Sequence, residues 1–181
     1  MLTDIQRRKL TRYFEVYDVD DDGHLAAADF ERVIENVRIL HGAGTESPAH
    51  GRLQEAYMSR WDGLRRYADA DTDGAVDCVE WLGYWSGLLD TEERYYDEVV
   101  SVTDLLFQVF DTDEDGVLGP DEYCDFFGVF GLPSALARQV FVELDLDGDG
   151  VISREELLEL ADQFYRSDDP GAPGNKLFGP Y

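Results

Sequence analysis

The chain has 181 residues, of which 40 are acidic and 15 are basic, so its formal net charge is −25. This charge would repel nucleic acid and anionic membrane surfaces, and neither is expected as a partner. Hydrophobic residues make up 44% of the chain and aromatic residues 13%, which excludes a wholly disordered acidic polymer.

The start of the chain and its cysteines indicate where the protein works. No long apolar run follows the basic residues near the first methionine, so a secretory signal is not expected, and no stretch is long enough to span a bilayer. Cys78 and Cys124 lack a metal-ligand spacing and are expected to be reduced thiols. We therefore expect a cytoplasmic protein, and the 13 arginines against 2 lysines are typical of GC-rich bacteria.

The first predicted unit is a helix, an acidic loop and a second helix. Thr3 and Gln6 have the spacing of a capping box, which predicts a helix start at this point. The loop runs from Asp18 to Asp29. Apolar residues recur at helical spacing on both sides of it, namely Leu10, Tyr13, Phe14 and Tyr17 before it and Phe30, Val33, Ile34 and Val37 after it.

The same twelve-residue loop returns at 69–80, 111–122 and 145–156, again between apolar stripes of helical period. Each copy has acids at positions 1, 3, 5 and 12 and glycine at position 6. The expected ligands are the side chains of Asp18, Asp20, Asp22, Asp29; Asp69, Asp71, Asp73, Asp77, Glu80; Asp111, Asp113, Asp115, Glu122; Asp145, Asp147, Asp149, Glu156; and the position-7 backbone carbonyls of His24, Ala75, Val117 and Val151.

This spacing is that of the EF-hand calcium loop, for a mechanical reason. Calcium needs about six to eight oxygens at roughly 2.3–2.6 Å, and alternate residues of a tight loop can turn oxygens inward. Glycine permits the sharp turn, and the last acid closes the coordination sphere with both oxygens. Four copies in register predict three to four Ca²⁺ per chain. Seventeen of the 40 acids occupy ligand positions, so four divalent ions would reduce the formal charge from −25 to −17.

The four loops differ at two positions. Loop 1 ends in Asp29, which is one methylene shorter than glutamate, and this favours Mg²⁺ at that loop. Loop 2 has Asp77 at position 9, which can bind directly or hold a bridging water, whereas Arg65 and Arg66 on the incoming helix favour an empty site. The imidazole of His24 is expected to be a spectator.

Loop pairing is predicted by position 8, which is apolar in every loop (Leu25, Val76, Leu118 and Ile152) and suits a very short antiparallel ladder. We expect an all-α fold of four helix–loop–helix units in two compact pairs, covering 1–90 and 91–166. Hands 1 and 2 are joined by a long linker between His41 and His50, where both histidines are expected to be solvated. Hands 3 and 4 are joined by a short one at 131–133.

A Gly- and Pro-rich tail, 167–181, follows the last predicted helix and is expected to be non-helical. It carries Leu177, Phe178 and Tyr181, three large apolar residues that a solvated tail would seldom hold so close together. We therefore expect the tail to fold back over apolar surface between the two pairs.

Four hands, a long first linker, an aromatic-rich core and this tail resemble the sarcoplasmic calcium-binding proteins and their bacterial relatives of the calerythrin type. The resemblance implies a compact calcium or calcium/magnesium buffer, and a monomer is expected. One alternative is a sensor that regulates a protein target, but such sensors use a Met-rich groove and this chain has 2 methionines. A luciferin-type carrier is a third possibility, weakened because no histidine lies on a core stripe. No nucleophile–base pair, phosphate loop or zinc signature appears, so catalysis is not expected.

Overall fold

The structure, a computed structural model, describes residues 1–42 and 48–181. Its elements are α1 (Asp4–Tyr17), β1 (His24–Leu25), α2 (Ala27–Leu40), α3 (Pro48–Tyr67), β2 (Val76–Asp77), α4 (Cys78–Leu89), α5 (Glu92–Tyr95), the π-helix η1 (Tyr96–Val100), α6 (Ser101–Phe110), β3 (Val117–Leu118), α7 (Pro120–Val129), α8 (Ser134–Leu144), β4 (Ile152–Ser153), α9 (Arg154–Arg166) and the 3₁₀ helix η2 (Pro173–Lys176).

The predicted all-α fold of four helix–loop–helix units is confirmed. Because α5, η1 and α6 follow one another without a break, they form the single incoming helix of hand 3, and the described residues therefore contain eight long helices. The capping box at Thr3 is present, since its hydroxyl oxygen accepts from the Gln6 amide at 3.2 Å and the Gln6 side chain accepts from the Thr3 amide at 2.9 Å. The first helix therefore begins where this sequence signal places it.

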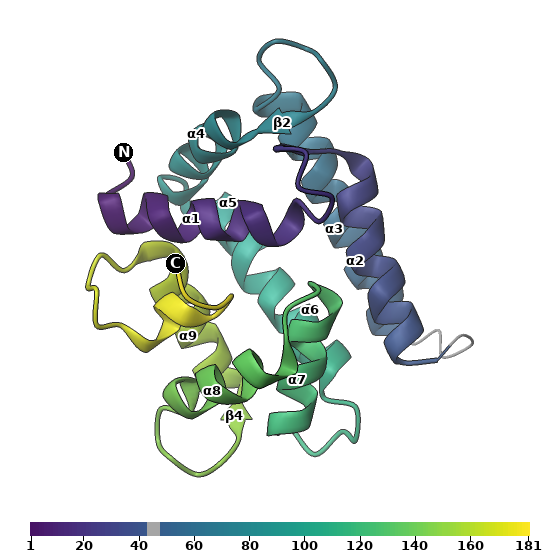
Figure 1. The fold of residues 1–181 in the computed structure, drawn as a ribbon, viewed down its shortest axis with the longest axis vertical. Coiled ribbons are helices and arrows are strands. Elements are labelled where there is room, and N and C mark those ends of the chain that lie inside the picture. The colour runs from purple at the N-terminus through teal and green to yellow at the C-terminus, as the bar shows by residue number, and fades with distance from the viewer. Residues whose placement is uncertain (43–47) are drawn as a thin grey trace.

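Two short antiparallel ladders join the loops. In the β1–β2 ladder Leu25 lies opposite Val76, and in the β3–β4 ladder Leu118 lies opposite Ile152. All four residues are buried. Hand 1 therefore pairs with hand 2 and hand 3 with hand 4, and Figure 1 shows β2 and β4 toward opposite ends of the long axis.

The two pairs share one hydrophobic core. Helix α1 of hand 1 packs against α4 and also against α9 of hand 4, while α2 packs against α7 and α3 against α6. Figure 1 shows α1 crossing the front of the molecule between α4 and α9. Aromatic contacts cross the same boundary, because the Trp85 and Tyr165 rings stack with centroids 4.8 Å apart and those of Tyr17 and Phe130 meet edge to face at 5.7 Å.

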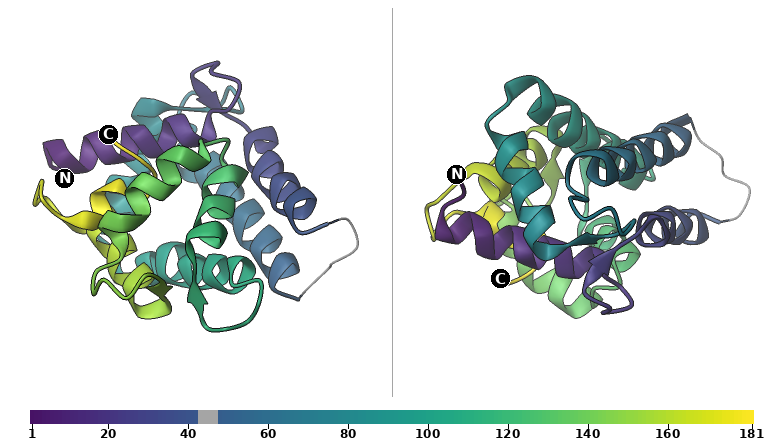
Figure 2. Two further views of the ribbon diagram at one scale, coloured as in Figure 1. Left: turned by 60° about the horizontal axis from the view of Figure 1, so that its bottom comes forward. Right: turned by 90° about the horizontal axis from the view of Figure 1, so that it is seen from above.

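The tail folds back into this core, as its apolar residues predict. Leu177 and Phe178 are each 3% exposed, and η2 packs against α9. Figure 2 shows the C-terminal end lying beside α1. One turn of 3₁₀ helix, η2, forms where no helix was expected. Ala172 in extended conformation precedes it, and Pro173 supplies a preset φ at its first position.

A buried ammonium group connects the tail to the first helix. Lys9, whose side chain is fully buried, donates to the carbonyl oxygens of Gln163 at 2.8 Å and Ser167 at 2.7 Å and to Oδ1 of Asn175 at 2.8 Å. Asn175 in turn donates to the carbonyl oxygen of Asp169 at 2.8 Å. All three ammonium donors therefore have acceptors, which come from both α9 and the tail.

The histidines of the first linker depart from the expectation of solvated loop residues. His41 caps the end of α2, and His50 lies in the first turn of α3. Nε2 of His50 lies 2.9 Å from Nδ1 of His41, and the His41 ring contacts Phe110 edge to face at 5.8 Å. Both are half-buried, since α3 already begins at Pro48 and places His50 in a helix rather than in a solvated loop. Residues 43–47 of the predicted linker lie outside the described residues. Among the described helices, none has the length and apolar character of a membrane span.

Candidate metal centres

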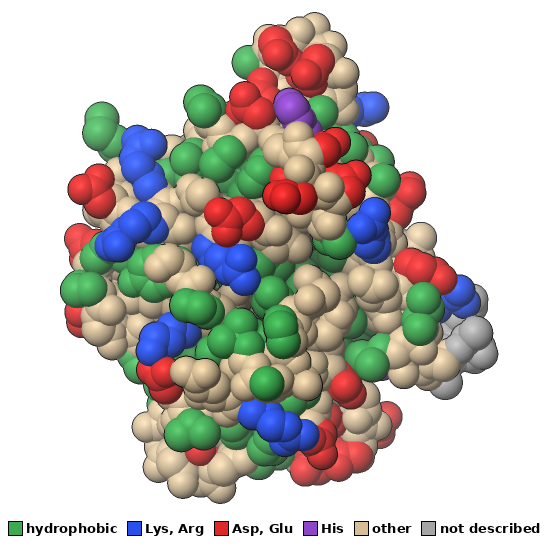
Figure 3. All heavy atoms as spheres, viewed as in Figure 1, with side chains coloured by type: hydrophobic (Ala, Val, Ile, Leu, Met, Phe, Trp, Pro, Cys, Tyr) green, Lys and Arg blue, Asp and Glu red, His purple; other side chains and the backbone are tan. Residues whose placement is uncertain are grey.

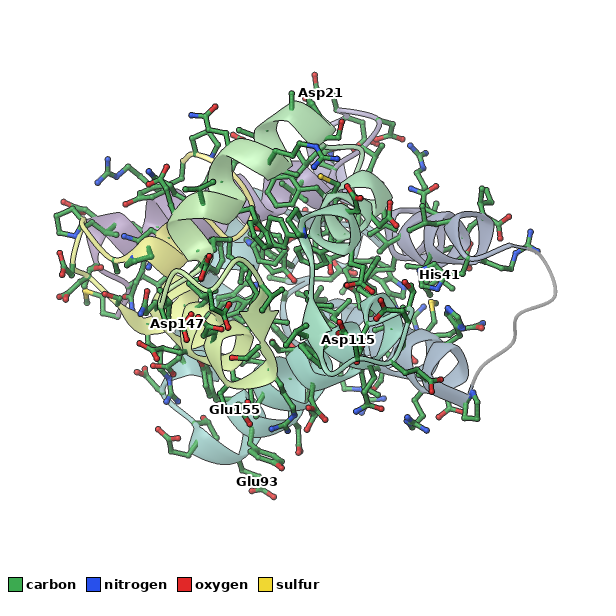
Figure 4. The ribbon with its side chains drawn as sticks, turned by 90° about the horizontal axis from the view of Figure 1, so that it is seen from below. Asp21, His41, Glu93, Asp115, Asp147 and Glu155 are labelled. Atoms are coloured by element: carbon green, nitrogen blue, oxygen red, sulfur yellow. The ribbon has the colours of Figure 1, made fainter. Side chains whose placement is uncertain are left out.

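Carboxylates converge in each of the four loops. The converging groups, whose ligand atoms lie within 4.8 Å of one another, are Asp18, Asp20 and Asp22; Asp69, Asp71 and Asp73; Asp111, Asp113 and Glu122; and Asp145, Asp147 and Glu156. Figure 4 shows Asp115 and Asp147 on the neighbouring loops 3 and 4, with Asp21 of loop 1 on another side of the molecule. So many like charges at this spacing repel one another unless a cation lies between them.

The loop backbone creates these clusters through glycine at position 6. Gly23, Gly74, Gly116 and Gly150 have φ between 83° and 93°, in the left-handed region that side chains disfavour. In each loop the amide of this glycine donates to the position-1 aspartate, for example from Gly150 to Asp145 at 2.9 Å. The first carboxylate is therefore fixed by the turn that the glycine makes.

Two position-1 carboxylates each retain an oxygen with no partner. Oδ1 of Asp69 and Oδ1 of Asp111 are buried and accept no hydrogen bond from the described residues. Burial and the neighbouring charge of Glu122 raise the pKa of Asp111, although the Gly116 amide opposes this. A buried, unpartnered carboxylate oxygen is costly, and a divalent cation at the centre of the loop would satisfy it. The donor set, all hard oxygens, fits Ca²⁺ or Mg²⁺.

The glutamate at position 12 connects the two ends of its loop. Glu122 accepts from the Thr112 amide at the loop start, at 2.8 Å, and from the Gly119 amide at position 9, at 2.9 Å. Glu80 and Glu156 make the same two contacts in loops 2 and 4. These bonds orient the glutamate toward the cluster, and backbone and side-chain donors lower the pKa of Glu156 against the effect of burial.

Loop 1 lacks this connection. Asp29 accepts from the position-9 amide of Ala26 at 2.8 Å, and the described residues give it no bond to the loop start. Its converging group contains positions 1, 3 and 5, as that of loop 2 also does. The Asp29 side chain is 4% exposed, and this burial raises its pKa even though the Ala26 amide opposes the shift. Within the described chain, the shorter side chain of Asp29 thus leaves loop 1 without the bond to the loop start that glutamate makes in the other three loops.

Position 9 has a structural role that the sequence pattern did not reveal. Asp77 is the N-cap of α4, because its Oδ1 accepts from the amides of Val79 at 2.8 Å and Glu80 at 2.9 Å. Ser153 caps α9 in the same way, accepting from the Glu156 amide at 3.2 Å. One Asp77 oxygen is thus committed to the helix, which leaves the other for an ion or a bridging water.

The position-7 residues, His24, Ala75, Val117 and Val151, follow the glycine turn and lie at or directly before the loop strands. The His24 side chain is half exposed, with Nδ1 3.1 Å from the backbone oxygen of Asp22. This backbone contact, followed by nearby carboxylates, raises the pKa of His24. The same Nδ1 also lies 3.9 Å from Oδ1 of Asp22, one of the converging carboxylates.

Family models match two parts of the chain. The family described as EF hand matches residues 137–161, and the one described as EF-hand domain pair matches residues 100–128. Calerythrin of Saccharopolyspora erythraea is 25% identical over 91% of this chain and 94% of its own length. The sarcoplasmic calcium-binding protein of Scylla paramamosain is 28% identical over 91% of this chain and 90% of its own length.

Solved structures show the same fold. A sarcoplasmic calcium-binding protein from amphioxus superposes with a TM-score of 0.75 at 23% identity, covering 100% of both chains. A Streptomyces coelicolor calcium-binding protein, described in terms of prokaryotic calcium-mediated regulation, has a TM-score of 0.71 at 25% identity over 88% of this chain and 97% of its own. The coelenterazine-binding protein of Renilla muelleri has a TM-score of 0.71 at 22% identity, covering 99% and 100%.

Proposed function

We propose that this chain, whose residues 100–128 and 137–161 match EF-hand models, acts as a calcium buffer rather than as a switch. Three to four Ca²⁺ bind at the loops through the carboxylates and position-7 carbonyls identified from the sequence, and loop 1 accepts Mg²⁺. The proposed setting is the bacterial cytoplasm, with the protein a monomer and not an enzyme. Similarity to calerythrin and to sarcoplasmic calcium-binding proteins supports this role.

One observation carries the proposal, namely that the protein's own residues fill its apolar interior. The Phe178 ring stacks on Tyr13 with centroids 4.4 Å apart and meets Phe164 edge to face at 5.0 Å. Phe178 also contacts Phe126 and Phe130 of hand 3. A sensor needs an apolar groove that a target helix can enter, and here the tail occupies the space between the pairs.

The interior also argues against a small-molecule carrier. Its central cavity, lined by Tyr13, Arg60, Thr103, Tyr165 and Phe178 among others, has a volume of about 20 Å³. Sites for organic ligands usually enclose about 300–1,000 Å³. A cavity of this size holds about one water molecule, so a luciferin-sized ligand would require the core to open.

Calcium titration with and without millimolar Mg²⁺, combined with a dye that reports exposed apolar surface, tests the buffer role. We expect three or four Ca²⁺ per chain, Mg²⁺ competition confined to loop 1, and less dye bound to the calcium-loaded protein than to the metal-free protein. Cancelling repulsion among the ligand acids stabilises the closed state, and metal binding to the folded form adds stability by mass action. Strong dye binding only with calcium would overturn the buffer proposal in favour of a sensor.

A further inference from the structure

A polar cleft of about 450 Å³ lies between α3, α4 and the continuous helix made by α5, η1 and α6. None of the proposed metal ligands lines it. Its walls carry three arginines, Arg60, Arg66 and Arg94, together with the rings of Tyr67 and Tyr84. Three guanidinium groups in one cleft are unusual in a chain with 15 basic residues and a net charge of −25.

The inner wall holds a buried cation without a carboxylate partner. Arg60 is 4% exposed, and it forms no ion pair with the described residues. It donates to the Tyr13 hydroxyl at 3.1 Å and to the backbone carbonyl of Glu98, and it lies over the Trp85 ring at 5.8 Å. Its Nε is buried and has no hydrogen-bond partner among the described residues. A buried guanidinium stays charged at any physiological pH, so Arg60 keeps a positive charge that no ion pair within the described residues neutralises.

The outer wall supplies two more guanidinium groups and aromatic surface. Arg94 lies over the Tyr84 ring at 4.9 Å and the Tyr67 ring at 5.7 Å, which holds its plane in place. Arg66 is exposed, and within the described chain it forms no ion pair. Tyr67 is 70% exposed, so one face of its ring is open to a ligand at the mouth of the cleft.

Three carboxylates also line the cleft, and their positions constrain the ligand. Glu98 is engaged by Arg94 at 3.2 Å and by the Tyr84 hydroxyl. Asp62 and Asp97 are exposed, so they lie toward solvent, while the buried Arg60 lies at the inner wall. With the cation at the inner wall and the carboxylates toward solvent, the cleft favours a ligand whose single anionic head points inward and whose body carries no further negative charge.

The π-helix explains how the inner wall is built. In a π-helix the backbone bonds run from residue i+5 to residue i, and the Ser101 amide accordingly donates to the Tyr96 carbonyl. The Glu98 carbonyl, inside this segment, accepts from the Arg60 guanidinium. Single turns of π-helix occur frequently at functional sites.

We infer that this cleft binds a small organic acid, whose one carboxylate or phosphate head is held by Arg60, Arg66 and Arg94 and whose flat body lies against Tyr67. Guanidinium groups match both head groups with paired N–H donors, which a single ammonium cannot do. The cleft is walled by both helices of hand 2, so the ligand would contact the unit that carries loop 2.

Binding is tested on the calcium-loaded protein by NMR titration at constant ionic strength. Benzoate and phenyl phosphate are the anionic probes, and neutral benzamide is the matched control. We expect saturable shifts of the cleft residues with one or both anions, at dissociation constants on the order of 1 mM or below, and no saturable shifts with benzamide. The two anions distinguish a carboxylate site from a phosphate site. Equal binding of benzamide, or no saturation by either anion up to about 20 mM, would overturn the inference.

Two neighbouring arginines provide the matched variants. Arg66→Gln removes a cleft guanidinium, whereas Arg65→Gln removes the same charge from the adjacent residue, which does not line the cleft. We expect about a tenfold loss of affinity for the first and less than about a twofold loss for the second. Equal losses would mean that the anion responds only to net charge. Both side chains are exposed, so neither variant is expected to unfold the protein.

Discussion

A single methylene distinguishes Asp29 from the glutamates that end the other three loops. Glu80, Glu122 and Glu156 each accept from two backbone amides, at the loop start and at position 9. Among the described residues, Asp29 accepts from the Ala26 amide alone. Loop 1 is therefore held less tightly around its centre than the other three.

Asp29→Glu should shift loop 1 toward Ca²⁺ and away from Mg²⁺. The longer side chain can reach both the cluster and the loop start, which suits the larger coordination sphere of calcium. Calorimetric titration with each metal measures the change, and the reciprocal Glu80→Asp should shift loop 2 in the opposite direction. Unchanged selectivity in both variants would mean that position 12 does not control ion choice.

Lys9 is a second residue at which a prediction can be made, because its burial changes its pKa. Burial lowers its pKa from 10.5 to about 8, against the opposing charge of Asp168. At pH values between these two pKa values, Lys9 is protonated in the unfolded chain and deprotonated in the folded protein. Lys9 should therefore contribute a rise in the free energy of unfolding as the pH increases from about 8 to about 10, whereas the thiols of Cys78 and Cys124, whose pKa burial raises, contribute in the opposite direction.

Urea unfolding at several pH values across this window checks the sign. Lys9→Met should remove the rise, whereas Lys176→Met, which changes the only other lysine, should retain it because Lys176 is at the surface with Glu143. A stability difference between the parent protein and Lys9→Met that does not grow with pH would contradict the assignment of the lowered pKa to Lys9.

At the scale of elements, the two ladders connect loops within a pair. Val117 lies opposite Ser153 and Leu118 opposite Ile152, so the backbone of loop 3 is bonded to that of loop 4. Ser153 also caps α9 and bonds to Glu156. Ser153 thus connects Glu156 of loop 4 to the backbone of loop 3, so a change at Glu156 can affect loop 3.

Glu156→Gln should cripple loop 4 and also weaken calcium binding at loop 3. The change removes a charge and one good ligand oxygen while nearly preserving volume. Titration of the variant should show two weakened sites, with loops 1 and 2 nearly unaffected. Normal affinity at loop 3 would show that the ladder does not transmit binding energy.

The tail docks through a close approach to α9 at one glycine. A Cβ at Gly174 would lie 2.7 Å from Cβ of Gln163 and closer still to the Leu160 carbonyl oxygen. The Gly174 amide already donates to Oε1 of Gln163 at 2.9 Å. Space for a methyl group is therefore absent at this contact.

Gly174→Ala should displace the tail and lower stability by about 2–4 kcal/mol, since Leu177 and Phe178 would lose their packing. Thermal melts of the calcium-loaded protein measure the loss. Gly171→Ala is the control, because a Cβ there meets only a side-chain oxygen of Asp169, at 3.3 Å. Equal melting of the two variants would mean that the docked tail adds no stability.

The sequence predicted the repeated parts of the molecule and missed what depends on tertiary context. Loop spacing, position-8 residues and the Thr3 capping box are local patterns, and the elements they predict are present. The π-helix at 96–100 was missed because its residues also fit an ordinary helix. The Arg60 cleft and the bonding of Lys9 join residues far apart in the chain, so no local pattern reveals them. The His41–His50 contact spans nine residues, but it depends on how α2 and α3 lie relative to each other.

At the scale of the whole molecule, charge and packing oppose each other. Figure 3 shows acidic side chains crowded at the upper end, over the first pair of loops. One core of buried residues nevertheless runs through both pairs. The packing contacts of this shared core must therefore outweigh the repulsion among the loop acids.

Metal-free protein should gain more thermal stability from added salt than calcium-loaded protein does. Raising NaCl from about 0.02 M to about 0.2 M shortens the Debye length and screens the repulsion that calcium otherwise cancels. Calorimetric melts with chelator and with calcium compare the two, and each should show one transition because the core is shared. Equal salt shifts would indicate that loop repulsion does not limit stability.

The contact between the first helix and the tail also governs how the chain can fold during synthesis. Lys9 and Asn175 are bonded across 166 positions, and the Phe178 ring stacks on Tyr13. A nascent chain on the ribosome cannot complete its core until Phe178 has emerged, because the partner of Tyr13 is still inside the exit tunnel. Chains halted earlier would retain exposed aromatic surface, which proteases and chaperones recognise.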